Sequence, residues 1–443
     1  MQAVAERVSL LADYDDFAAT VADQPSPIAD LRREGRERFA ALGFPTTRQE
    51  AWRKTNVRRI AQGSFRRAPG ELHGLSRARL EPFFLPDCAE LVFVNGRLAP
   101  ELSQPRQLPP GVIATSLAEA IAEHPDLVAE HLGRYAPIDQ HPFAALNTAF
   151  IADGAFVYVP RGTVVETPIH FLFVGTAGEE ATVSYPRNLL LAAESSQVTV
   201  IESYAGFGGD RYFTCPVTEI VCGANAVVDH YKMQEESIDA FHVAMQQSHQ
   251  RRSSNLFSHS ISHGGALVRN DIRAMLAEEG IDCTLNGLYL ARGTQHVDHH
   301  MWVDHKAPHC NSYELYKGVL EGSSRAVFNG TIYVHPGAQK TDAKQSNRNL
   351  LLSRDALVSS NPQLEIFADD VRCTHGSTTG HLEEEAIFYL RTRGIGEEAA
   401  KSLLTFAFAA EVLQEIRLES IKKGLEEFLF TRLPKGDVVR QAV

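Results

Sequence analysis

The 443-residue chain has few cysteines, no paired cysteine motif and no long apolar run. Its six cysteines are widely spaced, namely Cys88, Cys215, Cys222, Cys283, Cys310 and Cys373. No Cys-x-x-Cys pair occurs among them, so we expect reduced thiols rather than a four-thiolate zinc site or a disulfide framework. No window approaches ~20 uninterrupted apolar residues, and a membrane span is therefore not expected.

An excess of basic charge is also absent. The 43 Lys and Arg against 55 Asp and Glu give a net charge of −12, which argues against binding nucleic acid through bulk charge. Residues 1–7 contain no basic segment followed by an apolar one, so we expect no secretion signal. The sequence predicts a cytoplasmic protein.

Nucleotide-binding and nucleophile motifs are missing as well. The segment Gly337-Ala338-Gln339-Lys340-Thr341 resembles a phosphate loop, but Gln339 replaces the glycine needed before the lysine. The glycine-rich segment 206–209 lacks the third glycine of a dinucleotide fingerprint, and no Gly-x-Ser-x-Gly elbow occurs. If the system that contains this chain uses ATP, another subunit must hydrolyse it.

The residue pattern divides the chain into three regions. Residues 1–146 are mainly helical in pattern, with a capping-box sequence at 47–50, an Asn95-Gly96 turn between two short strands, and a helix over 117–132. Residues 147–380 contain short runs rich in Val, Ile and Phe, separated by Gly, Ser, Asn and Asp. Residues 381–443 return to helix, with apolar positions at i, i+3 and i+4.

A sandwich, a propeller or a β-helix would each fit the middle region. The spacing of its runs is irregular, so it contains no strict repeat of 20–50 residues. We favour a β-helix with uneven rungs, because polar residues also alternate inside the runs. The apolar face of the C-terminal helices can pack on this β region or on a sister helix, can dock a partner, or can do both.

Cys373 and His375 form the first candidate site. They lie two residues apart among strand formers, and in a strand both side chains would emerge from one face, roughly 6.5–7 Å apart. A thiolate and an imidazole so placed can hold a metal or a sulfur species. The alternative, which the spacing alone favours, is a buried free cysteine beside a hydrogen-bonded histidine.

A histidine-rich stretch from 296 to 309 forms the second candidate. In a strand, His296, Asp298 and His300 would share a face and His299 would point the other way. Imidazole and carboxylate donors make a mononuclear metal site conceivable. A polar ladder of ordinary hydrogen bonds is favoured over it, because no fixed-spacing metal motif is present.

Blocks of sequence in the second half of the chain carry a family resemblance. They are Val303-Asp304-His305, His309-Cys310, Asn329-Gly330, Gln345-Ser346-Asn347, Pro362-Gln363-Leu364-Glu365-Ile366, and the segments 349–352, 369–376 and 388–395. Together they resemble the SufB/SufD family of the Suf iron–sulfur cluster assembly system. Within that family, the Cys-x-His-Gly form at 373–376 and the segment 48–55 look like the SufD branch.

The resemblance implies a fold and a set of partners. It implies a right-handed parallel β-helix core between an N-terminal helical region and a C-terminal helical domain. It further implies a heterodimer with SufB through the β-helix, and docking of the SufC ATPase on the C-terminal helices. The chain would be a non-catalytic scaffold that holds no cofactor tightly by itself, with transient iron or an iron–sulfur cluster in the complex.

For the site, the resemblance maps the family's functional positions onto Cys373 and His375, near the SufB interface. A neighbouring imidazolium would then lower the pKa of the thiol. Two other functions compete with this one: a β-helix enzyme that acts on polysaccharide, and a purely structural subunit that organises SufB and SufC. The cluster type, flavin binding and the stoichiometry of the complex are left open.

Overall fold

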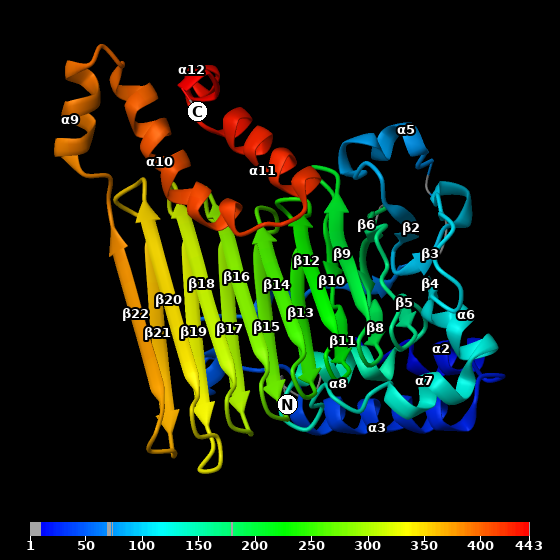
Figure 1. Ribbon diagram of the computed structural model, residues 1–443. Helices are drawn as coiled ribbons and strands as arrows, with labels where there is room; N and C mark the ends of the chain where they lie inside the picture. The colour runs from blue at the N-terminus through cyan, green and yellow to red at the C-terminus, as the bar shows by residue number, and fades with distance from the viewer. Residues whose placement is uncertain (1–9, 69–71, 73, 179, 443) are drawn as a thin grey trace.

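Two long sheets form the body of the computed structural model, which describes residues 10–68, 72, 74–178 and 180–442 (Figure 1). Sheet A has 12 strands and sheet B has 10, and from β11 onward successive strands alternate between them. Each strand from β11 to β20 pairs in parallel with the strand two places further along the chain. The predicted parallel β-helix with helical ends is confirmed. Residues 1–7, where no secretion signal was expected, lie outside the described residues.

The strands of sheet A are β1 (Phe65–Arg67), β4 (Ile113–Ser116), β5 (Ala155–Val159), β7 (Ala181–Ser184), β8 (Arg187–Ala192), β10 (Tyr212–Thr214), β11 (Val217–Cys222), β13 (Phe241–Gln250), β15 (Leu267–Leu276), β17 (His296–His305), β19 (Arg325–Val334) and β21 (Leu357–Ile366). Those of sheet B are β2 (Ala89–Val94), β3 (Arg97–Leu98), β6 (Ile169–Gly175), β9 (Gln197–Gly206), β12 (Val227–Glu235), β14 (Asn255–Ser262), β16 (Asp282–Ala291), β18 (Asn311–Leu320), β20 (Asp342–Leu351) and β22 (Arg372–Gly380).

The coils have similar lengths although their sequences differ. In sheet A, Leu267 pairs with His296 and His296 pairs with Arg325, and in sheet B Asn311 pairs with Asp342, so a coil takes about 30 residues. Many strands are buried on both faces. Tyr316 of β18, for example, faces the core between the sheets, while its neighbour Leu315 packs under the C-terminal helices. Two-sided burial removes the simple polar and apolar alternation that would mark a repeat.

The N-terminal region wraps one end of the β-helix. Its helices are α2 (Tyr14–Thr20), α3 (Ser26–Leu42), α4 (Arg58–Ala61), α5 (Arg77–Leu80), α6 (Leu117–Glu123), α7 (Pro125–His131) and α8 (Pro142–Ala149), with three short 3₁₀ turns, η1 (Glu50–Trp52), η2 (Glu81–Phe83) and η3 (Pro100–Leu102). The hairpin expected at Asn95-Gly96 is confirmed by the antiparallel pairing of β2 and β3. The helix expected over 117–132 is split into α6 and α7 at Pro125, which cannot continue a helix in mid-course.

The capping box expected at 47–50 is wrong. The segment forms only the turn η1, without a side-chain cap, and the Gln49 side chain instead accepts a hydrogen bond from the Thr46 backbone at 2.8 Å. Trp52 anchors the turn, as expected, because it is buried against sheet A. The guanidinium of Arg269 lies 3.7 Å from its ring centroid. Tertiary packing therefore overrides the local helix signal.

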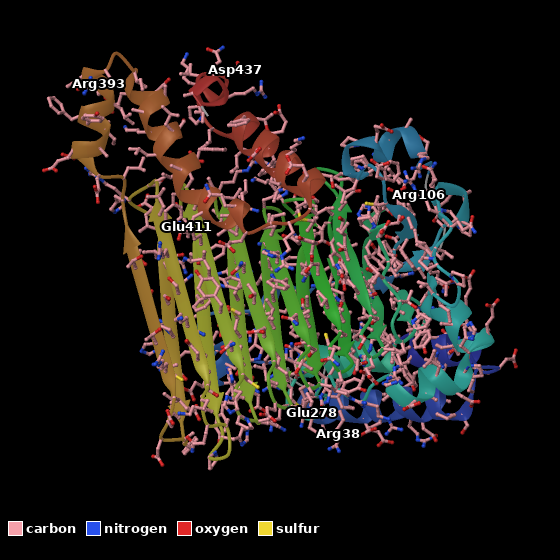
Figure 2. The ribbon with its side chains drawn as sticks, in the orientation of Figure 1. Arg38, Arg106, Glu278, Arg393, Glu411 and Asp437 are labelled. Carbon is pink, nitrogen blue, oxygen red and sulfur yellow. The ribbon has the colours of Figure 1, made fainter. Side chains whose placement is uncertain are left out.

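Four helices follow β22: α9 (Glu384–Thr392), α10 (Glu397–Gln414), α11 (Glu419–Arg432) and α12 (Gly436–Ala442). The apolar faces of α10 and α11 pack on the outer face of sheet B. Lys317 of β18 links sheet B to α10, because it donates hydrogen bonds to the Phe408 carbonyl at 2.8 Å and to the Glu411 carboxylate. Figure 2 shows Glu411 where α10 meets the strand ends, and Arg393 beside the turn that joins α9 to α10. Among the described helices, none combines the length and apolar character that crossing a bilayer requires.

Candidate functional site at the open end of the β-helix

The last coil of the β-helix is uncovered. β21 and β22 are the terminal strands of their sheets, and Figure 1 shows no further element beyond them. No residue of either strand is buried, whereas the strands of the preceding coil, β19 and β20, hold many buried side chains. One end of the β-helix interior therefore opens to its surroundings, while the N-terminal region occupies the other end.

Cys373 and His375 lie on this last coil. The segment is a strand, β22, in which Cys373 pairs with Ala343 and His375 pairs with Gln345. Ala343 and Gln345 are buried, and Cys373 packs against the core between the sheets. Because side chains two apart share a face, His375 also lies on the interior face of the coil. The pair thus faces the open interior, with Cys373 half-buried and His375 exposed.

The thiol of Cys373 is not activated in the free chain. Burial raises its pKa, and the Asp342 carboxylate adds to this rise, although a hydrogen bond with the Ala343 backbone acts in the opposite direction. We expected a neighbouring imidazolium to lower the pKa of this thiol, and for this chain alone that expectation is wrong. The thiol stays protonated at neutral pH, so binding a cation there must release a proton.

Cys373 nevertheless differs from the other cysteines. All six are free, as expected, but Cys88, Cys215, Cys222, Cys283 and Cys310 are buried. Burial raises the pKa of each of these five thiols. Of the six, Cys373 is thus the thiol that a metal or a sulfur donor can reach most directly.

Residues 296–305 of the histidine-rich stretch form β17, and several of their polar side chains make hydrogen bonds. Asp298 accepts hydrogen bonds from Arg269 at 2.7 Å and from Thr55 at 2.5 Å, on the outer face beneath the N-terminal region. His296 contacts the same Thr55 hydroxyl at 2.9 Å. His299 points the other way, as predicted, and lies against the Tyr289 ring.

In the described part of the chain, no group of three or more His, Cys, Asp and Glu side chains is placed to hold a metal ion. Ordinary hydrogen bonds, the favoured alternative, are made by His296, Asp298 and His299. Cys373 and His375 offer two donors on the last coil.

Sequence reasoning did not place two residues, Glu314 and Gln345, beneath this pair. Glu314 pairs with Gln345, and Gln345 pairs with His375, so the three occupy equivalent places in successive coils. Both Glu314 and Gln345 are buried. An offset of about 30 residues would have found them, but the coil length is not visible in the irregular spacing of the runs.

Comparison with known proteins identifies the family. Residues 173–408 match the SufBD core domain of SUF system FeS cluster assembly, and residues 6–171 match the SufBD protein N-terminal region. An iron–sulfur cluster assembly SufBD family protein of Synechocystis sp. is 33% identical over 92% of both chains. The iron–sulfur cluster assembly protein SufD of Escherichia coli is 33% identical, over 90% of this chain and 92% of its own. Protein ABCI7 of Arabidopsis thaliana is 28% identical over 94% of this chain and 88% of its own.

The chain belongs to the SufB/SufD family of iron–sulfur cluster assembly proteins. The predicted likeness to the SufD branch is confirmed, because the relatives of this chain include proteins named SufD from E. coli and from Bacillus subtilis.

Proposed function

We propose that this chain is a non-catalytic scaffold subunit that works with SufB and the SufC ATPase, and that Cys373 and His375 form its half of a site where iron and sulfur are assembled. The observation that carries the proposal is the position of the pair on the interior face of an uncovered last coil. Iron accepts both thiolate and imidazole ligands. Two donors at an open end suit a site that a second subunit completes.

The edges of the last coil support docking of SufB. β21 and β22 each present a long strand with one unpaired side, which is a ready template for pairing with another sheet. Leu357, Ile366 and Phe367 are exposed on or directly beside β21. A second β-helix placed end to end would cover these apolar groups and enclose Cys373 and His375.

Helix α9 supports docking of SufC. No residue of α9 is buried, and Phe388 and Tyr389 are exposed on it. Exposed aromatic side chains on one short helix are typical of a protein interface. In our proposal, ATP-driven movement of SufC passes through α10 and its Lys317 contact to the β-helix, and exposes the Cys373 and His375 pair to iron and sulfur.

Two other functions compete with this proposal. A polysaccharide-acting enzyme is disfavoured by membership of a cluster assembly family over nearly the whole chain. The experiment below separates a purely structural subunit from a subunit that carries half of the site. Cytoplasmic location follows from the proposed partnership and belongs to the same proposal.

The test is an anaerobic co-expression of this chain with SufB and SufC, with Cys373→Ala and His375→Ala as variants. Thr374→Ala is the matched control, because Thr374 lies between them on the opposite face of β22. We expect intact co-purification of the three subunits and loss of the visible absorption, iron and sulfide of the cluster in both variants. Full cluster content in both variants would refute the site and leave the structural subunit.

A further inference from the structure

Three polar side chains form a column on the inner face of sheet B. Glu314 of β18, Gln345 of β20 and His375 of β22 are aligned in register on successive coils. Neighbouring strands are about 4.8 Å apart, so each of these side chains is within reach of the next. Glu314 and Gln345 lie in the closed part of the interior, and His375 lies at its open end.

The Gln345 side-chain amide uses its nitrogen in a hydrogen bond, whereas its oxygen has no hydrogen-bond partner among the described residues. Its Nε2 donates to Glu314 Oε2 at 2.7 Å. Its Oε1 is buried and accepts no hydrogen bond from the described residues. A buried amide oxygen that accepts no hydrogen bond has lost its contacts with water without replacement, so a donor that reaches it would stabilise the site.

Gly330 fixes where that amide lies. A Cβ atom placed on Gly330 of β19 would lie 2.4 Å from Gln345 Nε2 and 2.7 Å from its Oε1. Only a residue without a side chain leaves this volume to the amide. The amide thus occupies a defined place between the sheets, one coil inward from His375.

We propose that Gln345 is the positioning residue for His375. Gln345 is held by its hydrogen bond to Glu314 and occupies the space that Gly330 leaves open. In the assembled complex, an imidazole N–H of His375 would donate to the free Gln345 Oε1, and this bond would fix the ring orientation and the tautomer. The second ring nitrogen then carries its lone pair toward the open end, where iron binds. Such a second contact on a ligating histidine typically changes metal affinity by about 10–100-fold.

Burial raises the pKa of Glu314 to about 8, so this carboxyl group is mostly protonated at neutral pH. The column beneath His375 is therefore largely uncharged, and Gln345 acts on the histidine as a neutral acceptor. This inference rests on the proposed role of His375 in the function above.

The test compares two substitutions in the complex co-purified with SufB and SufC. Gln345→Met keeps the volume and removes the acceptor, whereas Gln345→Glu keeps an acceptor oxygen to which protonated Glu314 can donate. We expect the Met variant to lose at least about tenfold in iron affinity and cluster content. We expect the Glu variant to stay near wild type, as should the outward-facing control Lys344→Met.

A side chain that merely fills space would give the opposite order, with Met tolerated and Glu harmful, and that result overturns the proposal. If the Met variant fails to assemble, Gly330→Ala displaces the amide while leaving Gln345 in place. Loss of cluster in an assembled Gly330→Ala complex supports the proposal, and full retention overturns it. Full cluster content in both Cys373→Ala and His375→Ala would refute the proposed function, whereas loss of cluster in His375→Ala with a normal Gln345→Met variant refutes only the positioning role.

Discussion

Replacing Arg269 with methionine should release the segment 51–55 from the outer face of sheet A. Arg269 is buried and makes a two-point contact with Asp271, with distances of 2.8 and 2.7 Å, and a further contact with Asp298 at 2.7 Å. It also donates to the Ala51 carbonyl at 2.8 Å and stacks on Trp52. One guanidinium therefore holds the turn η1 against the β-helix.

The expected magnitude follows from what methionine leaves behind. Two buried carboxylates would lose their cation, and breaking a buried ion pair from one side costs roughly 3–5 kcal/mol. Loss of the contact with Trp52 adds up to about 2 kcal/mol, which is not fully additive. Arg269→Lys should fall between wild type and Met, because an ammonium cannot reproduce the two-point contact with Asp271.

The pH dependence has a definite sign. Burial opposes ionisation of Asp271, but Arg269 and His141 outweigh it and hold the pKa of that carboxyl well below its usual range. This stabilisation is fully present above the ordinary aspartate pKa of about 3.9, and is lost as the pH falls through the lower folded value. In Arg269→Met the cation is gone, and burial then favours the protonated form of Asp271. The deficit of the variant is therefore largest near pH 7 and shrinks as the pH falls toward 4.

Hydrogen exchange of peptides covering 51–55, measured at pH 7 and corrected for intrinsic rates, is the assay. A local loss of roughly 3 kcal/mol corresponds to exchange about 100-fold faster. Arg273→Met is the matched control, since Arg273 lies on the same face of β15 and stacks on Trp302 at 5.6 Å without holding η1. Equal protection of 51–55 in wild type and Arg269→Met would refute the reasoning.

Three further predictions follow from the structure. Phe388→Asp should reduce co-purification of SufC by at least about tenfold without lowering the thermal midpoint, because the side chain is 67% exposed; unchanged capture would contradict α9 as the docking helix. Alkylation of Cys373 should be slow at neutral pH and should accelerate with rising pH beyond the range of an ordinary thiol, because its pKa is raised; a rate that levels off near pH 7 would contradict this. Gly287→Ala should destabilise the protein by roughly 1–3 kcal/mol in thermal unfolding, because the added Cβ would lie 2.2 Å from the Tyr316 ring. Gly376→Ala is the control, because a Cβ added there would meet no heavy atom of the described residues within 4 Å. Equal thermal midpoints for the two variants would contradict the packing argument.

Much of the fold could be predicted because its signals are local. Short β-type runs separated by Gly, Asn and Ser, and the Asn95-Gly96 turn, act over a few residues and were interpreted correctly. The coil length could not be predicted, because both faces of many strands are buried and no residue type must recur at each turn. The helix start expected at 47–50 failed for a related reason, since packing of Trp52 on sheet A decides that segment.

The sequence by itself determined that Cys373 and His375 share one face, because side chains in a strand alternate with a period of two. It could not determine which face that is. Only the tertiary structure decided that the pair faces inward, on the last and uncovered coil, with Gln345 and Glu314 stacked beneath it. The reason is physical: alternation is a property of one strand, whereas inward and outward exist only once two sheets enclose a core. The same enclosure raises the pKa of Cys373, an effect of burial that spacing along the chain does not contain.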